Sequence, residues 1–142
     1  MRNVKPIESV PAVIDLVCAC GNLRRAARAV THLYSSELLG GGLDLGPFTL
    51  LWTLTRVGVC TQQQLGKRLA LDSTTLTRTL APLIKKGWVG ARPGADRRER
   101  RLRVTPAGRR RMQQSVPNWQ RAQARLRKAL GSEDWGRLSK AL

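Results

Sequence analysis

Apolar residues recur at alternating steps of three and four near the start of this 142-residue chain. The positions are Val13, Leu16, Cys20, Leu23, Ala27, Val30 and Tyr34. This spacing puts the side chains on one face of a helix, so it predicts a long amphipathic helix over residues 10–39. The Gly40–Gly42 run ends that helix, because glycine is unfavourable inside a helix and readily takes the left-handed closing conformation.

Three shorter helices are predicted next. Phe48–Val57 is apolar on nearly every side, which indicates a buried helix. Thr61 and Gln64 have the spacing of a capping box, so a helix runs from Thr61 to about Ala70. Asp72 then caps a helix over 73–86. The apolar face of this helix is formed by Leu76, Leu80, Leu83 and Ile84, Pro82 introduces a slight bend, and Gly87 closes it.

The last part of the chain predicts a hairpin followed by two helices. Trp88–Arg92 and Arg101–Val104 are short extended stretches, and the second alternates basic and apolar residues. Thr105 and Pro106 open a helix over 106–130, kinked near Pro117, and Ser132 caps a short final helix. The prediction is a mainly α fold with one small β-hairpin.

Positive charge is concentrated in the middle of the chain. The formal net charge is +17, from 26 basic and 9 acidic residues. Residues 61–115 carry 14 basic and 3 acidic side chains, a net charge of +11, whereas residues 1–60 carry +2 and residues 116–142 carry +4. Charge gathered on one segment is typical of a surface that binds nucleic acid.

The two helices on either side of Asp72 are joined by about two residues, which predicts a helix-turn-helix. With leucines inward, the outer face of the second helix carries Ser73, Thr74, Thr77 and Arg78, whose side chains can hydrogen-bond to base edges in a major groove. The first helix would cross the phosphate backbone with Gln62, Gln63, Lys67 and Arg68. The plainer interpretation is that the hydroxyls at the helix start are only caps.

The hairpin supports the DNA interpretation, because its tip is rich in arginine. Arg92, Arg97, Arg98 and Arg100 would repel one another in solution unless anions intervene. A narrow arginine-tipped ribbon fits the minor groove, where the electrostatic potential is most negative. Phosphates would repel Asp96, so we expect this carboxylate to pair with a neighbouring arginine and orient the tip.

Several motifs together resemble the MarR-type winged helix-turn-helix regulators. They are TQQQLGKRLALDSTTLTRTLAPLIKKGWV over residues 61–89, the spacing Asp96-x-Arg98, and the following Leu102, Thr105 and Gly108. The resemblance implies a single unit over 1–142, with a helical dimerisation region (10–40 and 106–142) and a winged DNA-binding region (45–105). It also implies a minor-groove role for Arg98 with Asp96 as its partner, and recognition contacts from Ser73, Thr74, Thr77 and Arg78.

By the same resemblance, the protein is an interleaved homodimer that binds a pseudo-palindromic operator, usually as a repressor, and releases it on a small-molecule or oxidant signal. The apolar stripes point to a dimer independently, since one 142-residue chain has too few partners to cover them. The two half-sites should then lie about 34 Å apart, or a multiple of that distance.

Candidate sensing residues are three cysteines and two tryptophans. Cys20 lies on the apolar stripe and is expected to pack, whereas Cys18 lies off it on the side of Arg25, whose charge favours a thiolate. If both are helical they point about 200° apart and cannot readily bond to each other. Cys60 precedes the helix-turn-helix. Trp52 and Trp119 are candidates for lining an effector pocket, although tryptophans at helical spacing more often belong to a core.

Other functions find little support in the sequence. No catalytic group surrounds His32, the acidic residues are scattered, and no phosphate-binding glycine loop is present, so we expect neither an enzyme, nor a cofactor, nor a metal site. The chain shows no signal peptide and no apolar run of about 20 residues, which predicts a cytoplasmic protein without a membrane partner. The alternatives to a regulator are a protein that coats DNA without reading its sequence and a module that binds an acidic protein.

Overall fold

The computed structural model describes residues 18–94, 96 and 99–141. The elements in chain order are α1 (Ala19–Gly40), α2 (Leu45–Val57), β1 (Cys60–Thr61), α3 (Gln62–Leu69), α4 (Ser73–Lys85), β2 (Val89–Pro93), β3 (Arg100–Val104) and α5 (Pro106–Ala141). The mainly α fold with a small β-hairpin is confirmed.

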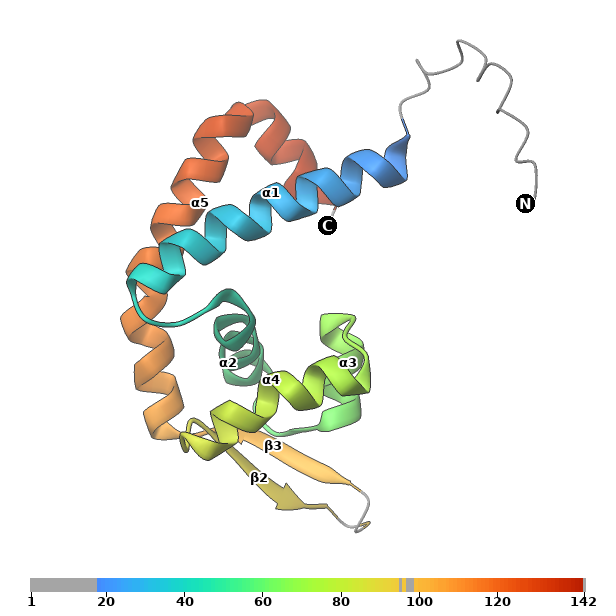
Figure 1. The fold of residues 1–142 in the computed structure, drawn as a ribbon, viewed down its shortest axis with the longest axis vertical. Coiled ribbons are helices and arrows are strands. Elements are labelled where there is room, and N and C mark those ends of the chain that lie inside the picture. The colour runs from blue at the N-terminus through green and yellow to red at the C-terminus, as the bar shows by residue number, and fades with distance from the viewer. Residues whose placement is uncertain (1–17, 95, 97–98, 142) are drawn as a thin grey trace, which may run out of the picture.

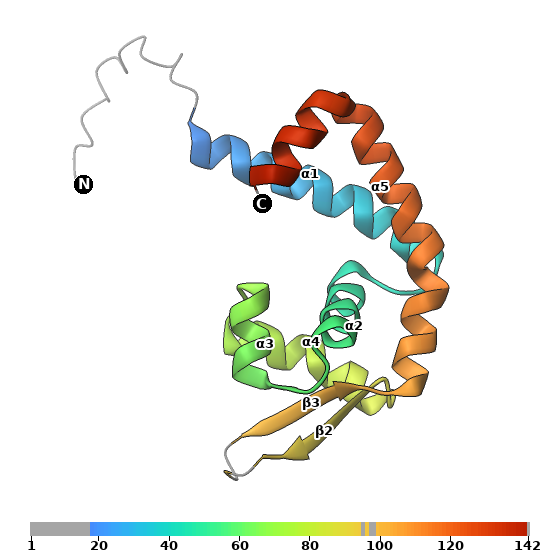
Figure 2. The same cartoon turned by 180° about the vertical axis from the view of Figure 1, so that it is seen from behind.

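The elements form two parts joined by one long helix (Figures 1 and 2). α2, α3, α4 and the β-hairpin make one part, called here the winged region (residues 43–105). α1 and the second half of α5 make the other, called here the helical region. α5 starts at the base of the hairpin, passes α2 and then packs along α1. The hairpin projects from the winged region at the end of the molecule opposite α1.

The sheet has three strands, one more than the hairpin that was predicted. Its order is β1-β3-β2, with both pairs antiparallel. β1 is only two residues long, and Cys60 lies opposite Leu102. A pair of residues is too short to show the alternation by which a strand is recognised in a sequence.

The hydrophobic core lies mainly in the winged region. Most of its fully buried members come from α2, α3, α4 and the sheet, joined by Leu38 of α1; those of the winged region include Leu50, Leu51, Leu54, Leu65, Leu76, Leu80, Leu83, Val89 and Leu102. The inward leucines of α4 are therefore buried as predicted. Four residues of α2 are buried and most of the others are half-buried, so the helix is less enclosed than its almost uniformly apolar sequence predicted.

The start of the first predicted helix changes, whereas the predicted division near the end of the chain holds. α1 begins at Ala19, because Cys18 has an extended backbone and caps the helix; residues 10–17 of the predicted helix lie outside the described residues. At the far end of the chain, α5 contains one residue with non-helical dihedral angles, Gly131 (φ 77°). The break at Gly131 confirms the predicted end of the helix over 106–130 and the start of a separate final helix, and Pro117 lies inside continuous helix.

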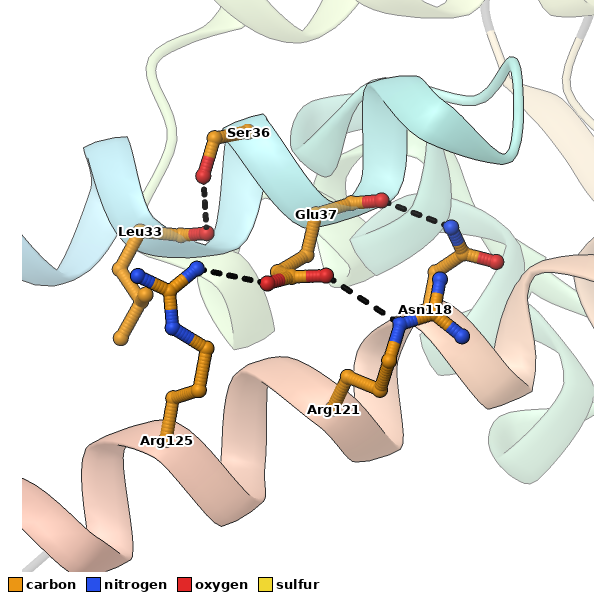
Figure 3. Close-up of polar contacts among 6 residues, drawn as sticks. All are labelled: Leu33, Ser36, Glu37, Asn118, Arg121 and Arg125. Atoms are coloured by element: carbon orange, nitrogen blue, oxygen red, sulfur yellow. Dashed lines mark hydrogen bonds and ion pairs between the residues drawn. The ribbon is translucent and has the colours of Figure 1, made fainter.

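Polar contacts tie the end of α1 to the middle of α5 (Figure 3). The Glu37 carboxylate accepts hydrogen bonds from Arg121 (3.3 Å) and Arg125 (2.6 Å). The Asn118 side-chain amide donates to the Glu37 backbone carbonyl at 2.8 Å. The two arginines hold the pKa of Glu37 below its ordinary value, with the Arg125 hydrogen bond as the main cause. These contacts set where α5 crosses α1.

Several large apolar side chains of the helical region are poorly covered within one chain. Leu23 is 69% exposed, Leu39 59% and Leu138 39%. Of the residues of α1, only Tyr34 and Leu38 are buried. In the part of the chain that the structure describes, no helix is both long enough and apolar enough to cross a bilayer.

Candidate nucleic-acid interface

The helix-turn-helix begins with the capping box that the sequence predicted. Thr61 Oγ1 accepts the Gln64 N–H at 3.1 Å, and Gln64 Oε1 accepts the Thr61 N–H at 2.9 Å. Both bonds satisfy N–H groups that have no partner inside the helix. α3 ends at Leu69 and is capped by Ala70, whose φ of 50° is left-handed, and the Leu71 N–H donates to the Gly66 carbonyl at 3.0 Å. These bonds make the tight turn into α4.

Asp72 caps α4 as predicted. Its carboxylate accepts the Thr75 N–H at 2.8 Å and the Thr75 hydroxyl at 2.6 Å. The hydrogen bond from the Thr75 side chain is the main reason that the pKa of Asp72 lies below its ordinary value. Pro82 is accommodated within the helix, which continues to Lys85. Because the cap and the buried leucines orient α4, its opposite face is directed to solvent.

The four residues predicted to face outward on α4 are all exposed: Ser73, Thr74, Thr77 and Arg78. On α3, Gln63, Lys67 and Arg68 are exposed, and Gln62 is half-buried. A hollow of about 520 Å³ lies at the junction of the two helices, lined in part by Gln63, Lys67 and Ser73. The structure therefore brings the predicted α3 and α4 residues together on one polar surface, which we call the reading face.

The hairpin presents a basic surface near the reading face. Arg92 and Arg100 are exposed on neighbouring strands. The tip is closed by hydrogen bonds from the Gly94 N–H to the Glu99 carbonyl (2.8 Å) and from the Glu99 N–H to the Asp96 carbonyl (2.9 Å). Arg97 and Arg98 lie outside the described residues, so the pairing of Asp96 with an arginine stays a prediction.

Two further arginines belong to this basic surface and were not singled out from the sequence as binding residues. Arg101 lies directly opposite Arg92, and Arg103 follows two positions later on the same face of β3. Together with Val59 they line a hollow of about 240 Å³. Like charges placed opposite each other on a sheet are unfavourable unless an anion lies between them. The alternation Arg-Leu-Arg-Val at 101–104 could have predicted that both arginines lie on one face of the strand, opposite the apolar residues.

The base of the hairpin is fastened to α5. Thr105 Oγ1 donates to the Gly87 carbonyl at 2.6 Å and accepts the Gly108 N–H at 3.1 Å. A Cβ at Gly108 would lie 2.1 Å from the Trp88 carbonyl oxygen, so this close approach requires glycine. Lys86 and Arg111 lie over the Trp88 ring, at 4.8 and 5.7 Å from its centroid. The hairpin is thus held at a fixed place beside α4.

The cysteines differ in part from the prediction. Cys20 is exposed among the residues that the structure describes, so the expected packing of its side chain is not seen within one chain. Cys18 is also exposed, and its Sγ accepts the Gly21 N–H at 3.4 Å as the cap of α1. Since Cys18 is not helical, the argument that the two thiols point 200° apart does not hold. Cys60 is buried, and burial raises its pKa.

The structure brings Trp52 and Trp119 together, and their role in lining an effector pocket stays a prediction. Their ring centroids are 5.3 Å apart with planes at 26°, and both rings stack on Phe48. The stack packs against the core and joins α2 to α5.

Among the residues that the structure describes, no group of three or more His, Cys, Asp or Glu could hold a metal ion.

The chain matches the model of the MarR family over residues 43–99. It is 34% identical to the M. tuberculosis transcriptional regulator MosR, whose structure was solved in complex with DNA; that match covers 87% of this chain and 91% of MosR, with a TM-score of 0.75. A variant of MarR from E. coli, complexed with operator DNA, has the same fold at 23% identity, with a TM-score of 0.79 over 92% of this chain and 96% of that one.

A curated relative, the HTH-type transcriptional regulator YwoH of Bacillus subtilis, is 30% identical over 83 residues. This match covers 58% of the chain and 61% of YwoH, so the chain spans less than two thirds of that relative.

Proposed function

Because this chain belongs to the MarR family of transcriptional regulators, we propose that it binds a pseudo-palindromic DNA operator as a homodimer and represses transcription from it. The observation that carries the proposal is the reading face beside the basic hairpin: hydroxyls and one arginine are exposed on α4, and several arginines are exposed on the strands next to it. MosR and MarR, which share the fold, were both solved with DNA.

In the proposed complex α4 enters the major groove and the hairpin enters the adjacent minor groove. Ser73, Thr74, Thr77 and Arg78 contact base edges or nearby phosphates, and Gln63 and Lys67 of α3 contact the backbone. Arg92, Arg97, Arg98 and Arg100 supply the hairpin's charge, and Asp96 orients the tip. The protein acts by binding and not by catalysis, and we expect it to act in the cytoplasm.

The homodimer is supported by the apolar residues that one chain leaves uncovered in the helical region. Leu23, Leu39 and Leu138 are exposed on α1 and α5, and a two-fold interface would cover such residues on both chains at once. A dimer also sets two reading faces at a fixed separation, so that half-sites spaced by one helical turn of DNA are bound together.

The release signal is proposed to be a small molecule or a thiol-reactive compound. The two exposed cysteines at the start of α1, Cys18 and Cys20, are accessible to an oxidant, whereas Cys60 is buried and its raised pKa keeps the thiol protonated. Release of DNA on addition of peroxide should be lost in Cys18→Ser or Cys20→Ser and retained in Cys60→Ser. Equal release from all three variants would leave a small-molecule effector as the remaining candidate.

The first experiment is the ratio of operator to random-duplex affinity at a stated salt concentration. Footprinting upstream of the protein's own gene supplies the operator. A ratio on the order of 10³ or more supports a regulator, and parity supports a DNA-coating protein. No affinity for any duplex at moderate salt would favour the third reading, a module that binds an acidic protein.

The second experiment tests the hairpin. If the dimer neutralises about 8 to 10 phosphates, log K should fall with log salt at a slope of roughly −7 to −9. Neutralising Arg97, Arg98 and Arg100 together should make the slope less steep by about 5, since six charges are lost per dimer. Neutralising Arg127, Lys128 and Lys140 removes equal charge from the helical region and should leave the slope unchanged. Promoter binding that survives the hairpin change would refute this arrangement.

A further inference from the structure

The side chain of Gln62 joins the two helices of the helix-turn-helix. Gln62 is the first residue of α3, and its Nε2 donates a hydrogen bond to Thr77 Oγ1 at 2.8 Å. Thr77 lies 15 positions later on the exposed face of α4. Gln62 is half-buried, whereas its neighbour Gln63 is exposed. Gln62 is therefore placed to act on Thr77.

The hydroxyl of Thr77 differs from those of two nearby threonines on α4. The Thr75 hydroxyl donates to the Asp72 carboxylate at 2.6 Å, and the Thr79 hydroxyl donates to the Thr75 carbonyl at 2.9 Å. Both hydrogens are thus used inside the protein. Among the contacts of the described residues, the Thr77 hydroxyl receives a hydrogen bond from Gln62 and donates none.

A hydroxyl has one hydrogen to donate and two lone pairs that accept. When the amide of Gln62 occupies a lone pair on the protein side, the hydrogen of Thr77 remains available on the solvent side. Thr77 then meets DNA as a donor. In the major groove the acceptors are N7 of a purine, O6 of guanine and O4 of thymine, whereas the amino groups of cytosine and adenine are donors.

We propose that Gln62 is a positioning residue that makes Thr77 a hydrogen-bond donor to a base edge, so that the operator carries an acceptor atom at the base pair that Thr77 meets. This rests on the proposed function, because it requires α4 to enter the major groove. Gln62 acts through Thr77 and contributes to the choice of sequence without contacting a base.

A double-mutant cycle on the full-length protein tests the proposal. Gln62→Met keeps the length of the side chain and removes the amide, and Thr77→Val keeps the shape and removes the hydroxyl. Affinities are measured for the operator and for a set of single base-pair variants. Thr77→Val should weaken operator binding about three- to tenfold per half-site, the range expected for one hydrogen bond. Gln62→Met should reduce discrimination at the same base pair.

The decisive value is the affinity of the double variant. If Gln62 acts through Thr77, Gln62→Met should cause no further loss in the Thr77→Val background. Gln63→Met is the matched control, because this exposed glutamine neighbours Gln62. The loss of operator affinity that Gln63→Met causes should add to the loss caused by Thr77→Val. Thermal unfolding midpoints of all variants should stay close to that of the unaltered protein, since each change is nearly isosteric.

Three results would overturn the inference. Additive losses from Gln62→Met and Thr77→Val would mean that Gln62 contacts DNA by itself. An equal loss on operator and random duplex would mean that Thr77 donates to a phosphate. A preference for an amino group at the affected base pair would mean that Thr77 accepts. Failure of the proposed function is distinguishable, because the unaltered protein would then bind operator and random duplex equally.

Discussion

The winged region and the helical region are built in opposite ways. In the winged region, leucines from three helices and the sheet are buried together, and the polar side chains of α4 face outward. In the helical region, ion pairs of Glu37 with Arg121 and Arg125 link α1 to α5, and leucines of both helices are exposed. One chain completes the first region by itself, whereas the second has apolar surface that a partner chain would cover.

The largest effect is expected from placing a charge in the uncovered part of the helical region. Leu23→Asp should convert a dimer to monomers, because an aspartate there would be buried without a partner in the interface. Operator affinity should then fall on the order of a thousandfold or more, toward nonspecific binding. Analytical ultracentrifugation and operator titration measure both changes.

Asn22→Asp is the control for Leu23→Asp, since it adds the same charge at an adjacent exposed position. The Leu23 variant should keep its helical circular dichroism, because Leu23 is exposed and Leu38 is the residue of α1 that packs in the core of the winged region. A Leu23→Asp protein that stays dimeric would show that the exposed leucines lie outside the interface.

The next effect is a loss of stability in the winged region. Leu54 is fully buried on α2, and Leu54→Ala should reduce the free energy of unfolding by about 2 to 5 kcal/mol, through lost apolar contact and the cavity that remains. Urea unfolding measures the loss. Arg56→Ala, at an exposed position of the same helix, should change stability by less than about 1 kcal/mol. Equal losses in the free energy of unfolding at both positions would mean that burial of Leu54 does not stabilise the fold.

A smaller effect tests whether the start of the helix-turn-helix is set locally. Thr61→Ala removes the cap of α3 and should cost about 1 kcal/mol, because one backbone N–H loses its partner. Thr74→Ala, at an exposed position in the first turn of α4, should stay within about 0.5 kcal/mol of the unaltered protein. Chemical denaturation compares the two variants.

The smallest effect concerns the ion pairs of Figure 3. The pKa of Glu37 is lowered on folding, so its contribution to stability is present above about pH 4.5, its ordinary pKa, and is lost as the pH falls toward the lower folded value. Glu37→Gln should lower the unfolding midpoint at pH 7 and converge with the unaltered protein in acid. Glu133 forms an exposed pair with Arg137, so Glu133→Gln should change neither the unfolding midpoint at pH 7 nor its dependence on pH. A pH-independent difference for Glu37→Gln would show that the pairing is not the cause.

Features formed within a few residues could be predicted from the sequence. The capping box of Thr61 and Gln64, the cap at Asp72 and the outward residues of α4 all follow from spacings of three and four positions. The burial of Cys60 and the exposure of Cys20 could not be predicted, since each depends on which other element lies nearby. The stack of Trp52 on Trp119 brings α2 against α5, and no local pattern indicates that contact.

The sequence by itself determined where α3 and α4 start, which face of α4 is apolar and where positive charge gathers, because these depend on side chains close along the chain. The tertiary structure decided which distant groups meet: Glu37 with Arg121 and Arg125, more than eighty positions away, and Gln62 with Thr77. The physical reason is that a hydrogen bond acts over about 3 Å, so its partners are set by how helices pack and not by their order in the chain.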